Sequence, residues 1–387
     1  MFLGTGAGSP SLERNVQGAA VKLGDGRYVL VDCGEGTQQT LLRVAASRAP
    51  VTGDRGFRAS KVACVCVTHL HGDHAFGLPG LVCYLDAAAS DGAPPLRIVG
   101  PVGVAAMLRS ALLLSRTELR NGYAVDEIDA APLNVAGRGA AYEAAARAHA
   151  CALPPAPHPD ERPGRVVRRG DWGDVLGLSG GVAVSCAELD HGCVACVGYR
   201  IQEAPRVGAV DPRAVRAAAE RAGDDPRRLF PLLRAAAASG VSAVALADGA
   251  ALDVAACYPG GALLAGRGVA VLGDCAHGTG GNAAAAADLC RGADLVVHEA
   301  TFADEHADLA LARGHSTPGA AGAFARDAGA GALALWHFSP RYRSDPDFAA
   351  KFRAAAAAAF GGGDVTLAAD ELRLPVARTA RPPAPPN

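Results

Sequence analysis

The chain has 387 residues, of which 50% are hydrophobic and 20% are charged, as is usual for a globular protein. No apolar run is long enough to span a membrane and no signal peptide is visible, so we expect no membrane segment. The net charge of −2 excludes a global basic field that would attract nucleic acid.

The first predicted elements are two strands that end in polar turns. Met1–Leu3 leads into a glycine-rich turn through Pro10, and such a turn can present backbone N–H groups to an anion. A strand over Arg27–Asp32 and a helix through 39–46 follow. The Asp32 carboxylate stands at a strand end, where it can brace a neighbouring metal loop by hydrogen bonding to its backbone or its imidazoles. A turn-capping role is the competing interpretation.

An apolar, β-branched strand over 62–67 precedes the most informative stretch of the chain, Thr68-His69-Leu70-His71-Gly72-Asp73-His74. Its three imidazoles and one carboxylate suit zinc and similar divalent metals. His69 and His71 alternate in an extended segment and can aim at one ion, while Asp73 and His74 follow the bend and can aim at a second. The alternative, chance histidines on a polar loop, is weakened because three of the chain's 11 histidines fall within six residues.

The middle of the chain continues the alternation of strand and helix, with a strand over 96–99 and a helix over 102–114. Residues 134–181 are rich in proline and arginine and predict a flexible surface insertion. We do not expect His149 and His158, which lie there, to bind metal. A strand over 182–189 then delivers His191, although an isolated histidine is usually structural.

Two further features of the middle region carry competing interpretations. Cys193 and Cys196 have the spacing of a zinc or redox pair, but no second such pair exists, and the 11 scattered cysteines favour buried apolar positions. Residues 202–250 predict two short helices. Between Arg200 and Gly240, eight arginines stand against three aspartates and two glutamates.

The last third of the chain places polar residues after three predicted strands. A strand over 269–273 ends at Asp274, whose two carboxylate oxygens can bridge two metals. A strand over 294–298 leads into Glu299, and His315 precedes a helix that ends near 328. A strand over 332–336 ends in His337-Phe338-Ser339-Pro340-Arg341-Tyr342. A helix over 347–360, a strand and a disordered tail over 378–387 complete the expected order.

The THLHGDH stretch resembles the metallo-β-lactamase superfamily. Together with FLGTG and RN near the start, VDCGEGTQ, GLPGL, HG before GYRI, HEAT and HFSPRY, it closely resembles ribonuclease Z. That family consists of metal-dependent endonucleases that trim the 3′ trailer from precursor tRNA. The resemblance covers nearly all of residues 1–345 except 134–181. It implies an α/β fold, a four-layer αββα sandwich over 1–377, with a protruding tRNA-binding arm over 202–250.

The resemblance also implies a reaction centre with two zinc ions. His69, His71, His191 and Asp274 would hold one ion, and Asp73, His74, Asp274 and His337 the other. His315 paired with Glu299 would donate a proton, Asp73 would take one from the nucleophile, and Ser339 and Arg341 would bind phosphate oxygens. The product would be a tRNA with a 3′ hydroxyl after the discriminator nucleotide. The implied partners are precursor tRNA and a second copy of the chain as a homodimer, without a membrane. We expect a soluble intracellular protein of the cytoplasm or of an organelle, such as a plastid or mitochondrion.

Two departures from the family pattern keep alternatives open. The arm tip reads Asp224-Asp225-Pro226-Arg227-Arg228 where many members are rich in Gly and Pro, and a solvated helical hairpin is the competing interpretation. Cys275 replaces the usual threonine after Asp274. The main functional alternative is a phosphodiesterase of the same fold that acts on another RNA or on a small phosphodiester. A noncatalytic RNA-binding relative and a thioester or β-lactam hydrolase remain as weaker alternatives.

Overall fold

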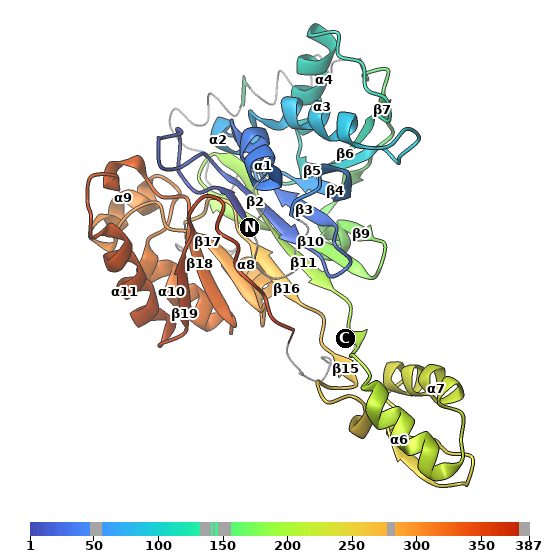
Figure 1. Cartoon of the computed structure of the whole chain (residues 1–387). Helices are drawn as coiled ribbons and strands as arrows, with labels where there is room; N and C mark the ends of the chain where they lie inside the picture. Colours follow the sequence, from blue (N-terminus) through green and yellow to red (C-terminus); the bar gives the residue numbers. More distant parts are fainter. Residues whose placement is uncertain (47–55, 132–140, 142–143, 146–155, 277–282, 379–387) are drawn as a thin grey trace. The chain divides into compact units, whose positions relative to one another are not determined.

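The computed structural model describes residues 1–46, 56–131, 141, 144–145, 156–276 and 283–378 (Figure 1). The chain divides into two compact units. The first comprises residues 1–201 and 268–375, and the second comprises 202–267 together with the chain from 376 onward. The second unit contains residues 202–250, which were predicted as an arm of one domain over 1–377, and most of the expected disordered tail lies outside the described residues.

The first sheet of the first unit has eight strands. They are β1 (Phe2–Gly4), β2 (Gly18–Lys22), β3 (Tyr28–Val31), β4 (Val62–Cys66), β5 (Leu96–Pro101), β6 (Tyr123–Ile128), β7 (Glu161–Arg162) and β8 (Val166–Val167). The strands from β3 to β6 run parallel, so their carboxyl ends share one edge. Helices α1 (Thr37–Ala46), α3 (Leu78–Ala88) and α4 (Val104–Leu114) bury their apolar residues against this sheet.

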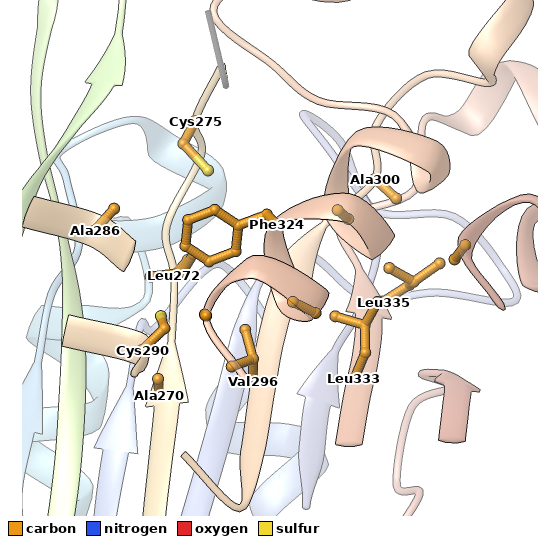
Figure 2. Packing of buried hydrophobic residues seen from close by; sticks show 14 of the residues in the cluster. Ala270, Leu272, Cys275, Ala286, Cys290, Val296, Ala300, Phe324, Leu333 and Leu335 are labelled. Carbon is orange, nitrogen blue, oxygen red and sulfur yellow. The ribbon is translucent and has the colours of Figure 1, made fainter. Parts of the chain in front are cut away.

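The second sheet has seven strands in the order β19-β18-β17-β16-β11-β10-β9. They are β9 (Leu176–Leu178), β10 (Val182–His191), β11 (Val194–Glu203), β16 (Gly268–Val271), β17 (Leu295–Glu299), β18 (Ala332–Trp336) and β19 (Asp364–Leu367). Helices α8 (Ala283–Cys290), α10 (Pro318–Asp327) and α11 (Phe348–Phe360) cover it. Figure 2 shows this core, in which the ring of Phe324 from α10 lies among Leu272, Cys275 and Ala286.

The two sheets lie between the two helix layers, which gives the expected αββα sandwich of the metallo-β-lactamase fold (Figure 1). The two sheets contact each other close to the histidine-rich stretch over 68–74. The Tyr199 hydroxyl on β11 donates to the Val67 carbonyl, and the Val197 N–H donates to the Thr68 carbonyl. The short helices α2 (Gly72–Ala75) and α9 (Ala307–Ala312) fall in loops. Among the described residues, no helix is both long and apolar enough to cross a bilayer.

The surface insertion predicted over 134–181 is wrong for its second half. β7 and β8 pair with β6 in the first sheet, and β9 pairs with β10 in the second. His158 and Trp172 are buried. These strands of two or three residues are too short to show a period of two, and the Pro and Arg content dominates the sequence pattern. Most of the first half lies outside the described residues.

The second unit is larger than the predicted arm over 202–250, because residues 251–267 complete it. Its elements are β12 (Arg206–Val207), α6 (Pro212–Ala222), α7 (Pro226–Ala238), β13 (Ala243–Ala245), β14 (Ala251–Asp253) and β15 (Leu263–Leu264). Leu229, Leu233, Leu252 and Tyr258 belong to its own apolar core. The unusual tip is an ordered turn, since Asp225 caps α7 by accepting from the Arg227 N–H and Asp224 accepts from Arg228 and from the Ala247 N–H.

Candidate metal centre

The seven predicted ligand residues come from four separate segments of the first unit and gather where its strands end. His69 and His71 follow β4, and Asp73 and His74 lie in α2. His191 is the last residue of β10. Asp274 follows β16 and His337 follows β18. Two groups can each hold a metal, one of His69, His71, His191 and Asp274 and one of Asp73, His74 and His337, with ligand atoms within 4.8 Å of one another in each group.

The first group is built from three imidazoles and one carboxylate oxygen. His71 Nδ1 lies 3.0 Å from His69 Nε2 and 3.2 Å from His191 Nε2. Asp274 Oδ2 lies 3.8 Å from His69 Nε2 and 3.7 Å from His191 Nε2. His71 is the exposed member of the group, so solvent reaches the site from its side.

The second group shares the other oxygen of the same carboxylate. His74 Nε2 lies 3.3 Å from His337 Nε2, and His337 Nε2 lies 3.4 Å from Asp73 Oδ2. Asp274 Oδ1 lies 3.4 Å from His74 Nε2 and 3.3 Å from His337 Nε2. Asp274 therefore points one oxygen at each group, which is the arrangement that a bridging carboxylate requires.

Hydrogen bonds outside the two groups set the orientation of several ligands. Asp32 is fully buried, and its carboxylate accepts from the Thr68 N–H at 2.7 Å, from the Thr68 hydroxyl at 2.9 Å and from His74 Nδ1 at 2.8 Å. The Gly314 carbonyl lies 2.8 Å from His191 Nδ1. Because the outer nitrogens of His74 and His191 hold their protons for these acceptors, their Nε2 atoms are left free to bind metal.

The glycine-rich turn at the start of the chain also reaches the centre. The Gly8 N–H donates to Asp73 Oδ2 at 2.6 Å. The anionic group that this glycine-rich turn contacts is thus the carboxylate of Asp73. Asp32 and His337 both adopt positive φ angles, of 61° and 59°. Backbone strain of this kind persists where the surrounding structure fixes a functional geometry.

The donor set fits bound divalent metals. Asp274 Oδ1 is buried and, among the described residues, makes no hydrogen bond, although His74 Nε2 and His337 Nε2 lie 3.4 and 3.3 Å from it. The Nε2 atoms of His74 and His337 face each other at 3.3 Å. With protons held on the outer nitrogens, both inner atoms can present a lone pair to a cation between them.

The charge state of the histidines supports the same conclusion. Burial lowers the pKa of His69 and lowers that of His191 to about 4, so both imidazoles are neutral at neutral pH, which is the form that binds metal. Burial also acts to lower the pKa of His74, but the carboxylates of Asp274 and Asp32 outweigh it and raise that pKa. A positive charge is therefore favoured at this position, as a proton or as a metal.

The structure places Glu299 and His315 together at the side of the centre. His315 Nδ1 lies 2.9 Å from Glu299 Oε1. Burial acts to lower the pKa of His315, but the neighbouring Glu299 carboxylate overcomes this and raises it to about 9. The imidazole is therefore protonated at neutral pH and can donate a proton. His315 also forms a third group with Asp274 and His337 that could hold a metal.

Ser339 and Arg341 lie near the centre but outside both ligand groups. The Arg341 guanidinium sits 4.8 Å from the centroid of the Phe302 ring, and that ring is 5.8 Å from the ring of His315. The Ser339 hydroxyl accepts from the Arg341 N–H, and its own N–H donates to the Thr301 carbonyl. The Arg341 cation is thus connected through the Phe302 ring to His315, which is partly exposed.

The sequence analysis missed two threonines that contact the ligands. The Thr68 hydroxyl lies 3.1 Å from His69 Nδ1, and the Thr301 hydroxyl lies 2.8 Å from His337 Nδ1. Their position directly before the first histidine and two residues after Glu299 was a signal, because hydroxyls near ligands often orient them.

Comparison with known proteins agrees with this geometry. Residues 16–88 match the metallo-β-lactamase superfamily. The chain is 34% identical to ribonuclease BN of Cronobacter sakazakii over 346 residues, which covers 89% of this chain and 90% of that protein. It is 32% identical to ribonuclease BN of Salmonella typhi over 345 residues, covering 88% and 89%.

Solved structures show the same relationship. The short form of human tRNase Z superposes with a TM-score of 0.59 at 26% identity, covering 97% of this chain and 98% of that one. The long form of RNase Z from yeast shares the fold, with a TM-score of 0.54 at 17% identity, covering 95% of this chain and 40% of that one. The chain is a member of the ribonuclease Z family, which includes ribonuclease BN, within the metallo-β-lactamase superfamily.

Proposed function

We propose that this chain is an endoribonuclease that uses two zinc ions to remove the 3′ trailer of precursor tRNA, leaving a 3′ hydroxyl after the discriminator nucleotide. The observation that carries the proposal is His315, whose Nδ1 lies 2.9 Å from the Glu299 carboxylate beside two ligand groups that share Asp274. This combination suits cleavage of a phosphodiester with an alkoxide leaving group. The family relationship supports RNA as the substrate, since the relatives carry the names ribonuclease BN and tRNase Z.

The residues would divide between two metal ions that share one carboxylate. His69, His71, His191 and Asp274 would hold one ion, and Asp73, His74, Asp274 and His337 would hold the other. When bound, such a pair of ions supplies a nucleophile at neutral pH and neutralises charge on the phosphodiester.

The side chains would then handle the protons of the reaction. Asp73 is only half-buried and faces His337, so it can take a proton from the attacking water. As the new oxygen bonds to phosphorus, the bond from phosphorus to the 3′ oxygen of the tRNA breaks. His315 gives its proton to that oxygen, which becomes the 3′ hydroxyl, and the phosphate stays on the 5′ end of the trailer.

Ser339 and Arg341 would bind phosphate oxygens next to this proton donor. The Arg341 guanidinium is already oriented by its contact with Phe302, and a planar guanidinium can make two parallel hydrogen bonds to a phosphate. The Ser339 hydroxyl accepts from the chain, which leaves its own proton for a phosphate oxygen.

The second unit would bind the folded part of the tRNA. The net positive charge of the whole unit is smaller than that between Arg200 and Gly240, since residues 202–267 hold eight arginines against five aspartates and two glutamates. The positive charge is concentrated on the exposed side chains of α6 and α7, namely Arg213, Arg216, Arg221, Arg227 and Arg234. Contacts from these residues to phosphates would be independent of sequence.

Replacing these arginines separates a tRNA enzyme from a general phosphodiesterase, which is the alternative function. Removing α6 and α7 altogether would expose Leu252 and Tyr258, so point variants are the better test. We expect the combined change Arg213→Ala, Arg216→Ala and Arg227→Ala to weaken precursor-tRNA cleavage and to leave a small chromogenic phosphodiester unaffected. The dependence of log affinity for tRNA on log salt should flatten by about two units.

A matched control is Arg326→Ala, since Arg326 is an exposed arginine of the first unit that pairs with Asp327. This variant should leave both activities and the salt dependence unchanged. Equal loss of both activities in the triple variant would mean that the second unit is structural. Undiminished tRNA cleavage would mean that recognition lies elsewhere.

The homodimer is also part of the proposal, since short members of the family commonly pair so that the arm of one subunit grips tRNA for the other. Light scattering of the purified protein measures its mass in solution. A mass close to twice 39.0 kDa is expected. A monomer that cleaves tRNA at full rate would show that a second copy is not needed for activity.

A further inference from the structure

Glu299 is a fully buried carboxylate that receives four hydrogen-bond donors. Its Oε1 accepts from the Cys275 N–H at 3.2 Å and lies 2.9 Å from His315 Nδ1. Its Oε2 accepts from the N–H of Thr301 at 2.9 Å and from the Thr301 hydroxyl at 2.7 Å. Since each oxygen faces a backbone N–H that can only donate, the ionised form satisfies all four contacts at once.

This arrangement decides how the Thr301 hydroxyl is used. Because its single proton goes to Glu299, only its lone pairs are left for its other neighbours, His337 Nδ1 at 2.8 Å and, at the longer distance of 3.3 Å, His315 Nδ1. His337 must therefore carry its proton on Nδ1 and present the lone pair of Nε2 toward Asp73 and Asp274, which lie 3.4 and 3.3 Å away. The hydroxyl thus fixes which nitrogen of His337 faces the centre.

We propose that Thr301 is a positioning residue that allows the single carboxylate of Glu299 to orient two histidines with different tasks, His315 by direct contact and His337 through the hydroxyl. The inference rests on the proposed role of His337 as a ligand of the second metal. It predicts that the second metal site, but not the first, depends on the Thr301 hydroxyl, which touches no metal.

The opposite sheet repeats the arrangement and supports the inference. Asp32 orients His74 directly at 2.8 Å and accepts from the Thr68 hydroxyl at 2.9 Å. The Thr68 hydroxyl in turn lies 3.1 Å from His69 Nδ1, a residue of the first ligand group. In both places, one buried carboxylate contacts one histidine itself and reaches a second histidine through a threonine. Thr68 is therefore the matched control for Thr301.

The test is metal binding and needs no RNA, so it can fail independently of the proposed function. The chain is stripped with a chelator and titrated with Zn²⁺ against a competing indicator, which resolves the stepwise affinities. In Thr301→Val we expect the affinity of one site to fall about 10–100-fold while the other changes less than about twofold. Thr301→Ser, which retains the hydroxyl, should bind nearly as the unmodified protein does. Thr68→Val should weaken the site that Thr301→Val spares.

A second background identifies the affected site. In His337→Ala, which lacks the second-site ligand, adding Thr301→Val should not change the affinity of the remaining metal, because the hydroxyl no longer has a ligand to orient. Thermal unfolding of the metal-free variants shows whether a loss of metal affinity is caused by a loss of folding stability. Unchanged affinities in Thr301→Val, equal weakening of both sites, or a further loss in the His337→Ala background would each overturn the inference.

Discussion

The contacts of Asp32 allow a substitution of nearly unchanged shape with a specific consequence. One carboxylate oxygen accepts from the Thr68 N–H, while the other faces the Thr68 hydroxyl and His74 Nδ1. In Asp32→Asn, the amide oxygen can keep the first contact, but the NH₂ group then points at a nitrogen that already carries a proton. Asparagine tolerates the positive φ of 61° at this position, so the backbone need not move.

The expected effect is on the tautomer of His74. The new NH₂ group and the Nδ1–H of His74 would both be donors facing each other. To avoid this, the imidazole must move its proton from Nδ1 to Nε2, the atom that faces His337 and Asp274. Leaving the buried donor unsatisfied instead costs about 1–3 kcal/mol. Since about 1.4 kcal/mol corresponds to a tenfold change in a binding constant, we expect the second metal to bind about 10–100-fold more weakly.

The assay is a competition titration of the metal-free protein, followed by thermal unfolding. The control is Asp86→Asn, because Asp86 is also a buried aspartate of the first unit and accepts from the N–H groups of Arg120 and Asn121, far from the centre. That control should lose stability without losing metal affinity. If Asp32→Asn binds two metals as tightly as the unmodified chain, the carboxylate does not set the tautomer of His74 and the reasoning is refuted.

Three other outcomes follow from the same geometry. His71→Ala should lose metal and cleavage activity together, because His71 Nδ1 lies between the Nε2 atoms of His69 and His191, and two full equivalents of metal in the variant would count against its assignment. His315→Ala should retain both metals and cleave about 10²–10⁴-fold more slowly, whereas loss of a metal would make it a ligand. Gly273→Ala should be destabilised by about 1–3 kcal/mol in urea unfolding, because a methyl group there would lie 2.7 Å from Thr68 Cβ and 2.8 Å from Cys196 Sγ. Gly170→Ala, where a methyl group meets nothing within 4 Å, should keep the free energy of unfolding of the unmodified chain. Equal stability of the two variants would mean that Thr68 and Cys196 can move away from the new methyl group at position 273.

The sequence predicted the sandwich and the clustering of the ligand residues because both depend on local patterns. The strands β4 and β18 are apolar runs of five residues, and a polar residue directly after such a run stands at a strand end. Parallel strands of one sheet share their carboxyl edge, but His74 and His337 follow strands of different sheets, so the family resemblance was needed to expect them together.

What the sequence could not show depends on partners that are distant along the chain. The bond of Thr301 to Glu299 and His337 requires the relative position of two strand ends, which no local period encodes. β7 and β8 are strands only because β6 offers them an edge. The extension of the second unit to Arg267 depends on pairing of β12 with β15 across more than fifty residues, a contact without a local signature.

The central claim is tested most directly by incubating the purified chain, loaded with zinc, with a precursor tRNA that carries a 3′ trailer, and by mapping both new ends at single-nucleotide resolution. The account predicts one endonucleolytic cut directly after the discriminator nucleotide, with a 3′ hydroxyl on the tRNA and a 5′ phosphate on the trailer. It predicts that a chelator abolishes the cut. A ladder of shortened trailers, a 3′ phosphate on the tRNA, or an intact precursor in the presence of fully loaded protein would contradict it.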